Sequence, residues 1–480
     1  MRKIQPAIYG CTPDIDCLLA PLLAKLALPL GSMTNSDAPS ESEEPPSSAD
    51  GAAIPPSVHD PWAALRIPSF RRYLAGTIFA ALGMQMQTVA VGWEVWERTH
   101  NALLLGMVGL VQFLPVILLL LPAGHAADRF QRKRILLCCL AVLVSSSVGL
   151  AVLSALQGDI RLMFVCLLAT GIARAFQQPT KASFLPHIVP REHFNNAVTW
   201  GTGGFHLASV LGPAVGGFVI AMSGSAALVY ALDAVATLTF LLLLFGVTSR
   251  PQVLSTSTIS VSSLLAGLRF VYHTKTILAA ITLDMFAVLL GGATMLFPIF
   301  ASPDMLDVGP TGLGWMRAAP AIGALVMSFA LAYRPPIQRA GRALLWSVVG
   351  FGVATIVFGL SKSFPLSLGA LFLTGAFDNI SVVIRHSLVQ MQTPDAMRGR
   401  VSAVNSLFIG ASNELGGFES GLAARLTSPV IAVVLGGVGT LVVVSIAALA
   451  WPEIRRYGRL DGTPVEVEDI PVPAPAEVAT

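Results

Sequence analysis

The sequence predicts an all-α polytopic membrane protein with twelve transmembrane helices in two six-helix pseudo-repeat halves. The first observation is composition: 54% of the 480 residues are hydrophobic and 12% are charged, whereas a soluble domain carries about a quarter charged residues. The second is a series of twelve apolar stretches, each long enough to cross a bilayer, which takes about 20 helical residues. The third is the concentration of basic residues in alternate loops. These observations exclude a soluble protein.

The two ends of the chain are expected to lack structure. Residues 1–57 form an N-terminal extension rich in Ser, Pro and Glu towards its end, and residues 452–480 form a tail that is first basic, then acidic and Pro-rich. Both compositions are typical of disorder. The apolar run 17–30 is too short and too interrupted to cross a bilayer. We hypothesise that translation starts at Met33 and that residues 1–32 are a misplaced start, which mass spectrometry of the purified N-terminus tests.

The apolar stretches fall into two groups of six. They lie at about 72–96, 103–123, 134–156, 160–183, 195–222, 226–247, 276–300, 312–333, 343–361, 366–390, 400–424 and 429–451. The connection 248–275 is the longest and most polar, and its amphipathic part, 262–274, is typical of a helix at the membrane interface. The sequence therefore predicts a first half at 58–247, a cytoplasmic linker at 248–275 and a second half at 276–451.

Basic residues predict the orientation. Loops on the side of both chain ends carry 17 Lys and Arg residues, and the opposite loops carry four. Because cytoplasmic loops hold the excess of basic residues, we expect both termini in the cytoplasm. The opposite loops are short, which excludes a large extracellular catalytic or binding domain.

The loop between the second and third stretches carries the strongest local signal, GHAADRFQRKR at 124–134. Its glycine permits close helix approach, and its basic residues suit lipid phosphates and helix C-termini. The spacing resembles the Gly-x-x-x-Asp-Arg-x-x-Arg-[Arg/Lys] motif of the major facilitator superfamily, which implies that fold and a gate that locks the cytoplasmic side in the outward-open state; an ordinary basic loop is the alternative. The matching residues are Gly124, Asp128, Arg129, Arg132 and Lys133.

Two further motifs resemble those of the same superfamily. GIARAFQQ at 171–178 is similar to its fourth-span arginine motif, with Arg174 and Gln178 on one helix face. GPAVGG at 212–217 is similar to its Gly-Pro-x-x-Gly-Gly motif, which is associated with antiporters and so implies export. A packing feature without directional meaning is the alternative. The residues that carry this second motif are Gly212, Pro213, Gly216 and Gly217.

Longer strings narrow the resemblance. They are WEVW at 93–96, GLVQFLP at 109–115, PREHFNNA at 190–197 and TPDAMRGRV at 393–401. They resemble the enterobactin-exporter-like, or transmembrane secretion effector, branch of the superfamily in bacteria, which implies a location in the bacterial inner membrane. This implies efflux of a small amphipathic molecule, such as a siderophore, drug or secreted metabolite, by proton antiport with alternating access. An importer of a small solute and a non-transporting sensor or scaffold are the alternatives.

No motif indicates an enzyme. Gly-x-Ser-x-Gly, His-Glu-x-x-His and phosphate-loop patterns are missing, and the five cysteines lack metal-ligand spacing. We therefore expect no metal and no cofactor. The expected partners are a small-molecule substrate, protons as the coupling ion and the lipid bilayer. Nucleic acid is not expected as a partner, and the protein is expected to be a monomer.

Acidic residues inside the spans are candidates for proton coupling, because a charge at the bilayer centre costs at least about 2.5–3.5 kcal/mol and so faces a cavity or a partner. Helical rise places Asp284, Asp378 and Glu414 in the central third of their spans and Asp233 shallower. We rank Asp284 and Asp378 first and expect Asp284→Asn or Asp378→Asn to abolish efflux in a folded protein. The alternative for each is a structural pair. Glu94, near an outer end, is expected to be solvated.

Polar side chains on the spans are candidates for the substrate pocket. Gln112, beside Phe113, is preferred. Arg385 lies seven residues after Asp378, about 10 Å along one helix face, so these two are expected to line one stripe. Ordinary interhelical hydrogen bonds are the alternative for each candidate. The candidates are Gln85, Gln112, Asn379 and Arg385.

Overall fold

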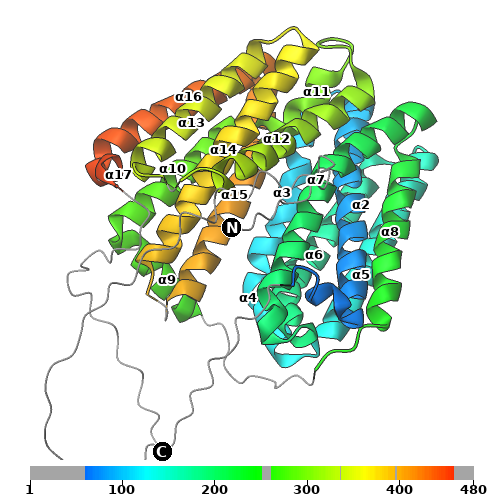
Figure 1. The fold of residues 1–480 in the computed structure, drawn as a ribbon. Helices are drawn as coiled ribbons and strands as arrows, with labels where there is room; N and C mark the ends of the chain where they lie inside the picture. The colour runs from blue at the N-terminus through cyan, green and yellow to red at the C-terminus, as the bar shows by residue number, and fades with distance from the viewer. Residues whose placement is uncertain (1–59, 251–260, 336, 395–396, 459–480) are drawn as a thin grey trace, which may run out of the picture. The chain divides into compact units, whose positions relative to one another are not determined.

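The computed structural model describes residues 60–250, 261–335, 337–394 and 397–458, and every regular element within these ranges is helical (Figure 1). The expectations for residues 1–57, and for much of the linker and tail, lie outside the described residues. The first half consists of η2 (Ala64–Arg66), α2 (Pro68–Thr99), α3 (Ala102–Leu118), α4 (Leu120–Arg129), α5 (Arg132–Ala155), α6 (Ile160–Ile188), η3 (Arg191–His193), α7 (Phe194–Ser223) and α8 (Ala227–Phe245).

The second half follows the linker helix α9. The predicted amphipathic segment 262–274 corresponds to α9, which packs against α10 and α15. The elements are α9 (Val261–His273), α10 (Lys275–Gly291), η4 (Ala293–Leu296), α11 (Phe297–Ala301), α12 (Gly309–Ala332), α13 (Ala340–Leu360), α14 (Phe364–Gln392), α15 (Arg398–Leu426), α16 (Pro429–Ala450) and α17 (Pro452–Arg456).

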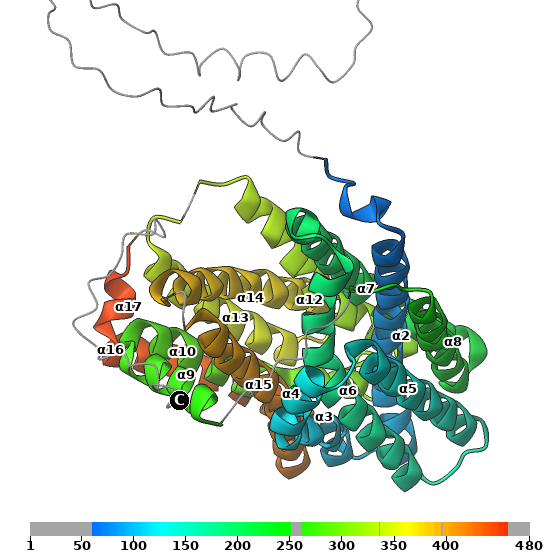
Figure 2. The ribbon, with the colours of Figure 1, turned by 90° about the horizontal axis from the view of Figure 1, so that it is seen from below.

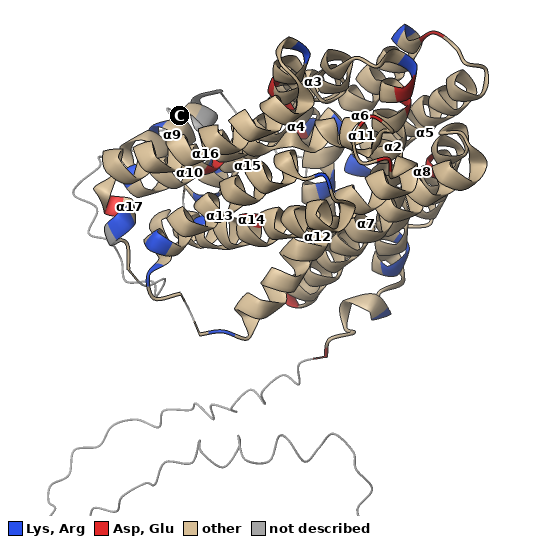
Figure 3. Ribbon diagram, turned by 90° about the horizontal axis from the view of Figure 1, so that it is seen from above, with Lys and Arg blue, Asp and Glu red and all other residues tan. Residues whose placement is uncertain are grey.

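The helices account for the predicted spans. Ten helices of the described chain are long and apolar enough to cross a membrane, and the bent pair α3–α4 makes an eleventh. The last predicted span but one, 400–424, coincides with α15, which carries five charged residues in 29 but packs against α3, α10 and α16 as a span would. Figure 3 shows that most of the helical ribbon is free of charged residues. The all-α polytopic membrane fold is confirmed, and twelve spans are consistent with it.

One predicted span is bent by 54° between α3 and α4. Helix α3 ends at Leu118 and α4 begins at Leu120. Pro122 lies four residues after Leu118, and a proline cannot donate to the carbonyl at i−4 and clashes with it. The break therefore lies where Pro122 requires one. Pro213 has no such effect, because α7 continues through it as one helix.

The halves meet through two pairs of helices. Within the first half α2 lies against α7 and α8, and within the second α13 lies against α14 and α16. Between the halves α3 packs against α15, and α7 packs against α12 (Figure 1 and Figure 2). Glycines permit the close approach at both crossings: Gly217 lies against Pro310 and Gly314, and Gly421 lies against the backbone of Gly106.

Gly217→Ala is expected to destabilise the protein by about 1–3 kcal/mol, because the added methyl group would overlap the Pro310 carbonyl oxygen and the Gly314 backbone. Gly203→Ala is the matched control, since Gly203 is an exposed residue of the same helix with open space around an added Cβ. Alanine in place of glycine favours a helix by up to about 1 kcal/mol, so the control should melt at or above the wild-type temperature. Thermal unfolding in detergent measures both, and equal melting of the two variants contradicts the tight crossing.

Buried apolar clusters distinguish the two ends of the bundle. We call the end where α4 stops and α5 starts the motif end, and the opposite one the far end. At the far end one cluster joins both halves and includes Val95 of α2, Phe300 of α11 and Phe358 of α13. Three other clusters each belong to a single half; Phe240 is in one and Leu344 in another. The halves therefore share a core at the far end and have separate cores towards the motif end.

Residues 452–458 are structured, so the expectation of a disordered tail is wrong for them. Helix α17 packs against α13, and Ile454 is only 1% exposed. The Ala340 amide donates to the Gly458 carbonyl oxygen at 3.0 Å. Ile454 and Tyr457 pack on the apolar cluster of the second half, and these contacts with the backbone hydrogen bonds attach the segment to it.

The expectation that Glu94 is solvated is also wrong. Glu94 is 4% exposed and forms an ion pair with Arg98, one turn later on α2. Arg98 also donates to the carbonyl oxygens of Ser154 and Gly158, at 3.3 and 3.0 Å. Those carbonyls lie at the C-terminal end of α5, where a cation is favoured. The carboxylate is therefore buried with its counterion at a helix end.

Candidate functional site

Charged and polar side chains of both halves interact with one another around α3, which packs against α6 of its own half and α15 of the other. Arg174 of α6 donates from Nη1 to Oε1 of Gln112 on α3, at 2.8 Å. Glu414 of α15 interacts electrostatically with Arg174 and with Arg317 of α12. We call Gln112, Arg174, Arg317 and Glu414 the interhalf cluster. Each half contributes one arginine, and one carboxylate serves both.

The Glu414 carboxylate lies directly against the other half. An added Cβ on Gly109 of α3 would meet Glu414 Oε2, so only a glycine leaves room for the carboxylate there. On the other side of α15, Gly416 packs on the α10 backbone at Leu289. Helix α15 is thus held between α3 and α10, and this packing aims Glu414 across the junction.

Arg317 was missed by the sequence analysis. Its Nη2 donates to the Thr294 carbonyl oxygen at 3.4 Å, and it lies 3.7 Å from the position of an added Cβ on Gly92 of α2. Its Nε is buried without a hydrogen-bond partner among the described residues. Its signal in the sequence is a basic residue inside the apolar stretch 312–333.

Asp233 belongs to a network inside the first half. Ser147 Oγ of α5 donates to Asp233 Oδ2 at 2.6 Å, and Gln87 Nε2 of α2 donates to Ser147 Oγ at 3.3 Å. Gly83 of α2 gives the carboxylate room. Asp233 also interacts electrostatically with Arg174. Asp233 therefore lies within the first half, and Arg174 connects it to the interhalf cluster.

Asp284 and Arg385 form an ion pair buried inside the second half. The pair joins α10 to α14, and the side chains are 7% and 2% exposed. Arg385 was expected to line one stripe with Asp378, but its counterion is Asp284. Neither partner faces the other half. For Asp284 this geometry matches the alternative that its carboxylate forms a structural ion pair. Arg385 is enclosed by the same pair, so it does not line a substrate pocket in this conformation.

Asp378 is close to this pair. Asp284 and Asp378 line one cavity of ≈ 10 Å³ between α10, α13 and α14, together with Ser347 and Ser381. The cavity lies within the second half. The carboxylates considered for proton coupling are therefore dispersed, and the described part of the chain contains no group of three or more His, Cys, Asp or Glu residues arranged to hold a metal ion.

Two of the polar pocket candidates make interhelical hydrogen bonds. Gln85 Nε2 of α2 donates to Ser209 Oγ of α7 at 3.0 Å. Ser328 Oγ of α12 donates to Asn379 Oδ1 of α14 at 3.1 Å. Each bond lies within one half. The hydrogen bond between Gln112 and Arg174 also lies within one half. It differs from the other two because Arg174 in turn interacts with Glu414 of the second half.

The basic residues of the loop motif make contacts within the first half. Lys133 Nζ donates to the carbonyl oxygens of Phe245 and Val247 at 3.0 and 2.8 Å, and so caps the end of α8. Arg132 Nη1 lies 3.0 Å from Nε2 of His187 at the end of α6. Gly124 is buried in α4, which packs against α6. The motif thus ties α4 and α5 to α6 and α8.

The Gly-Pro-x-x-Gly-Gly segment contacts two helices at once. Gly212 and Gly216 lie against Gln85 and Met86 of α2, and Gly217 lies against α12 of the other half. In the arginine motif, Gln178 is exposed while Arg174 points into the cluster. The segment therefore links packing within the first half to the crossing between halves.

Comparison with known proteins places these features in a family. A family model described as transmembrane secretion effector matches residues 59–470. The chain is 25% identical over 392 residues to the Enterobactin exporter EntS of Shigella boydii serotype 4 (strain Sb227) and to that of Escherichia coli O157:H7 (strain EC4115 / EHEC). Each match covers 81% of this chain and 93% of the relative.

Solved structures share the fold. A mutant of the peptide transporter POT aligns with a TM-score of 0.63 at 14% identity, over 81% of this chain and 95% of that one. A bacterial homolog of the human lysosomal transporter Spinster, in an inward-facing and occupied conformation, aligns with a TM-score of 0.62 at 14% identity, over 83% and 98%. At these identities the likeness concerns the fold alone.

Proposed function

The chain belongs to the transmembrane secretion effector family, and from this premise we propose that it exports a small amphipathic molecule by alternating access and proton antiport. It is a transporter of the major facilitator type and not an enzyme. The relatives named enterobactin exporters support export as the direction. Siderophores, drugs and secreted metabolites are the proposed substrate classes, and the transporting unit is proposed to be the monomer.

The interhalf cluster is the observation that carries the proposal. Alternating access moves one half against the other around a site between them. Arg174 and Arg317 come from different halves, and Glu414 interacts with both. Arg174 also interacts with Asp233, so two cations are balanced by two carboxylates and the charge of the cluster does not select an anionic substrate.

The arrangement of the cores supports an inward-facing state. Most of the basic residues of the loops, 17 against four, belong to the motif end, and such an excess favours the cytoplasmic side. The halves share a core at the far end only. With the motif end in the cytoplasm, this conformation would receive substrate from inside the cell, as an exporter must.

Loss of this protein from the source bacterium is expected to raise the amount of its substrate inside the cells and lower it in the medium, each at least about threefold. Mass spectrometry of cell extracts and medium from wild-type and deletion strains measures both. Complementation with the intact gene should restore the ratio, and complementation with an Arg174→Ala variant should not. An importer would give the reverse distribution, and an unchanged one would contradict transport.

A further inference from the structure

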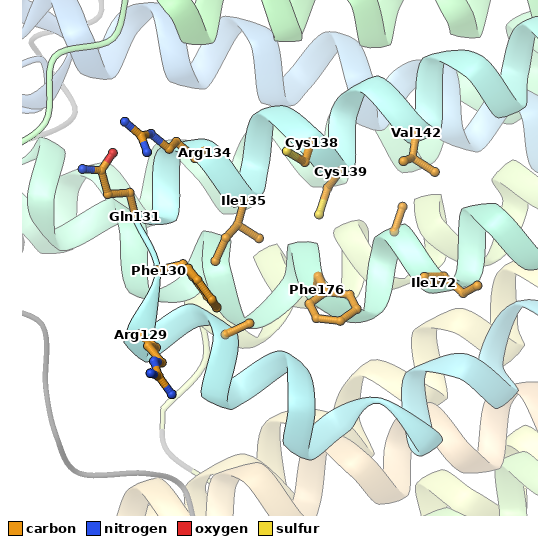
Figure 4. A pocket seen from close by; sticks show the side chains of 12 residues that line it. Arg129, Phe130, Gln131, Arg134, Ile135, Cys138, Cys139, Val142, Ile172 and Phe176 are labelled. Atoms are coloured by element: carbon orange, nitrogen blue, oxygen red, sulfur yellow. The ribbon is translucent and has the colours of Figure 1, made fainter.

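A groove on the first half lies away from the interhalf cluster. It has a volume of ≈ 580 Å³ and is bordered by α4, α5 and α6 (Figure 4). Its walls are mostly apolar and include Phe130, Ile135 and Phe176. The 54° bend between α3 and α4 changes the direction of the chain just before this groove. No function described above uses it.

One end of the groove is basic. Figure 4 shows Arg129, Gln131 and Arg134 at this end, with Arg129 and Arg134 on opposite sides of the turn between α4 and α5, and the apolar side chains running away from them along α5 and α6. Both arginines are exposed. An occupant that satisfies the whole groove therefore has an anionic head at the motif end and an apolar chain parallel to the helices.

The apolar part of the groove continues onto an exposed apolar surface. Ile172 of α6 lines the groove, and Val165 and Leu168 precede it on the same helix at helical spacing. All three are exposed large hydrophobic residues. In a transmembrane helix such a surface faces lipid tails. The groove is thus open to the lipid along its length.

We propose that this groove binds one anionic phospholipid, with its phosphate at Arg134 and an acyl chain along Cys138, Ile172 and Phe176. Charge complementarity supports this occupant, because basic pockets between transmembrane helices bind anionic headgroups and arginines bind phosphate oxygens with several donors. The lipid stabilises the bent arrangement of α4 against α5 and α6. The proposal does not depend on which substrate the protein transports.

The second half provides an internal comparison. Helices α5 and α13 begin at Arg132 and Ala340, so Arg134 and Arg342 are each the third residue of their helix. The seventh residue is Cys138 in α5 and Trp346 in α13. The corresponding surface depression is lined by Trp346, Arg342, Leu345 and Arg455. The second half thus has the large, exposed indole of Trp346 where the first half has Cys138, and its depression is smaller, ≈ 410 Å³.

Lipid binding to the purified full-length protein tests the proposal. Native mass spectrometry would compare phosphatidylglycerol with phosphatidylcholine of the same acyl chains. The wild type is expected to bind phosphatidylglycerol more tightly, and Arg134→Gln to weaken that binding about fivefold, the effect of one basic residue near an anionic headgroup. Cys138→Trp should weaken binding of both lipids, because the indole fills the groove.

Arg342→Gln is the matched control and should leave the tightest lipid in place. Melting temperatures report whether each variant is folded, and Arg134→Gln, at an exposed position outside the five gating residues, decides the test if Cys138→Trp is unstable. The proposal is overturned if Arg134→Gln binds phosphatidylglycerol as the wild type does. It is also overturned if the wild type shows no preference between the two lipids, or if Arg342→Gln has an equal effect.

Discussion

Asp284→Asn is expected to lower the free energy of unfolding by about 3–5 kcal/mol, because it leaves Arg385 charged and buried without its counterion. The two side chains are almost fully enclosed between α10 and α14, so water cannot replace the carboxylate. Thermal unfolding of the purified protein in detergent should show a clear drop in melting temperature. This makes Asp284→Asn one of the most destabilising conservative substitutions in the second half.

The double variant Asp284→Leu with Arg385→Met separates an unpaired charge from a general loss of packing. Replacing both partners of a buried ion pair with apolar residues of similar volume is often neutral or stabilising, so the double variant should recover most of the lost stability. Asp378→Asn is a local control, because Asp378 lines the same cavity and forms no ion pair with any residue that the structure describes. A double variant less stable than Asp284→Asn would contradict the assignment.

This result bears on how transport by Asp284 variants is interpreted. The sequence alone led us to expect that Asp284→Asn abolishes efflux while the protein stays folded. The ion pair with Arg385 predicts that the folded fraction itself falls. Transport therefore has to be expressed per folded molecule, and Asp378→Asn is the cleaner test of a coupling role in this cavity.

The spans could be predicted because hydrophobicity and length decide them. The third was expected at 134–156 and is α5, Arg132–Ala155. The break at Leu119 was not expected, because the apolar run continues through it and only the position of Pro122 relative to Leu118 indicates a break. Composition thus locates a helix in the membrane but does not show where it bends.

Partners of buried charges could not be predicted, because they come from other helices. Spacing on one helix placed Asp378 and Arg385 on a common face, yet Asp284, on α10, is the counterion. The expectation that Glu94 is solvated was wrong for a related reason. Its depth suggested contact with water, whereas Arg98 and the end of α5 enclose it. The depth of a residue along its span can be predicted from the sequence. Its burial by other helices depends on how the bundle packs.

The candidate site shows the same division. Three residues of the cluster were candidates from the sequence. Gln112 lies in the string GLVQFLP, Arg174 belongs to the fourth-span arginine motif, and Glu414 lies in the central third of its span. Nothing in the sequence indicated that the three are close together. Contact between α3 and α15 brings Glu414 to Gly109, one turn before Gln112. Arg317 was missed although it completes the cluster from the second half. The family resemblance therefore predicted the fold, and the helix crossings determined the cluster.

Glu414→Gln is expected to reduce efflux driven by a proton gradient by about 100-fold, the lower range for loss of a proton-transfer group. Under the proposed function, Glu414 is the coupling carboxylate because it alone among the four acidic candidates lies against the other half. Efflux from proteoliposomes at a fixed pH gradient measures the effect.

Exchange without a gradient distinguishes coupling from binding. Glu414→Gln should still exchange labelled for unlabelled substrate at close to the wild-type rate, because glutamine leaves both arginines available. Glu419→Gln is the matched control: Glu419 is on the same helix, five residues further and about 140° around it, and should retain driven efflux. If Glu414→Gln also retains it, proton coupling belongs to another carboxylate. Asp233, connected to Arg174 electrostatically, would then be the first to test, ahead of the enclosed Asp284.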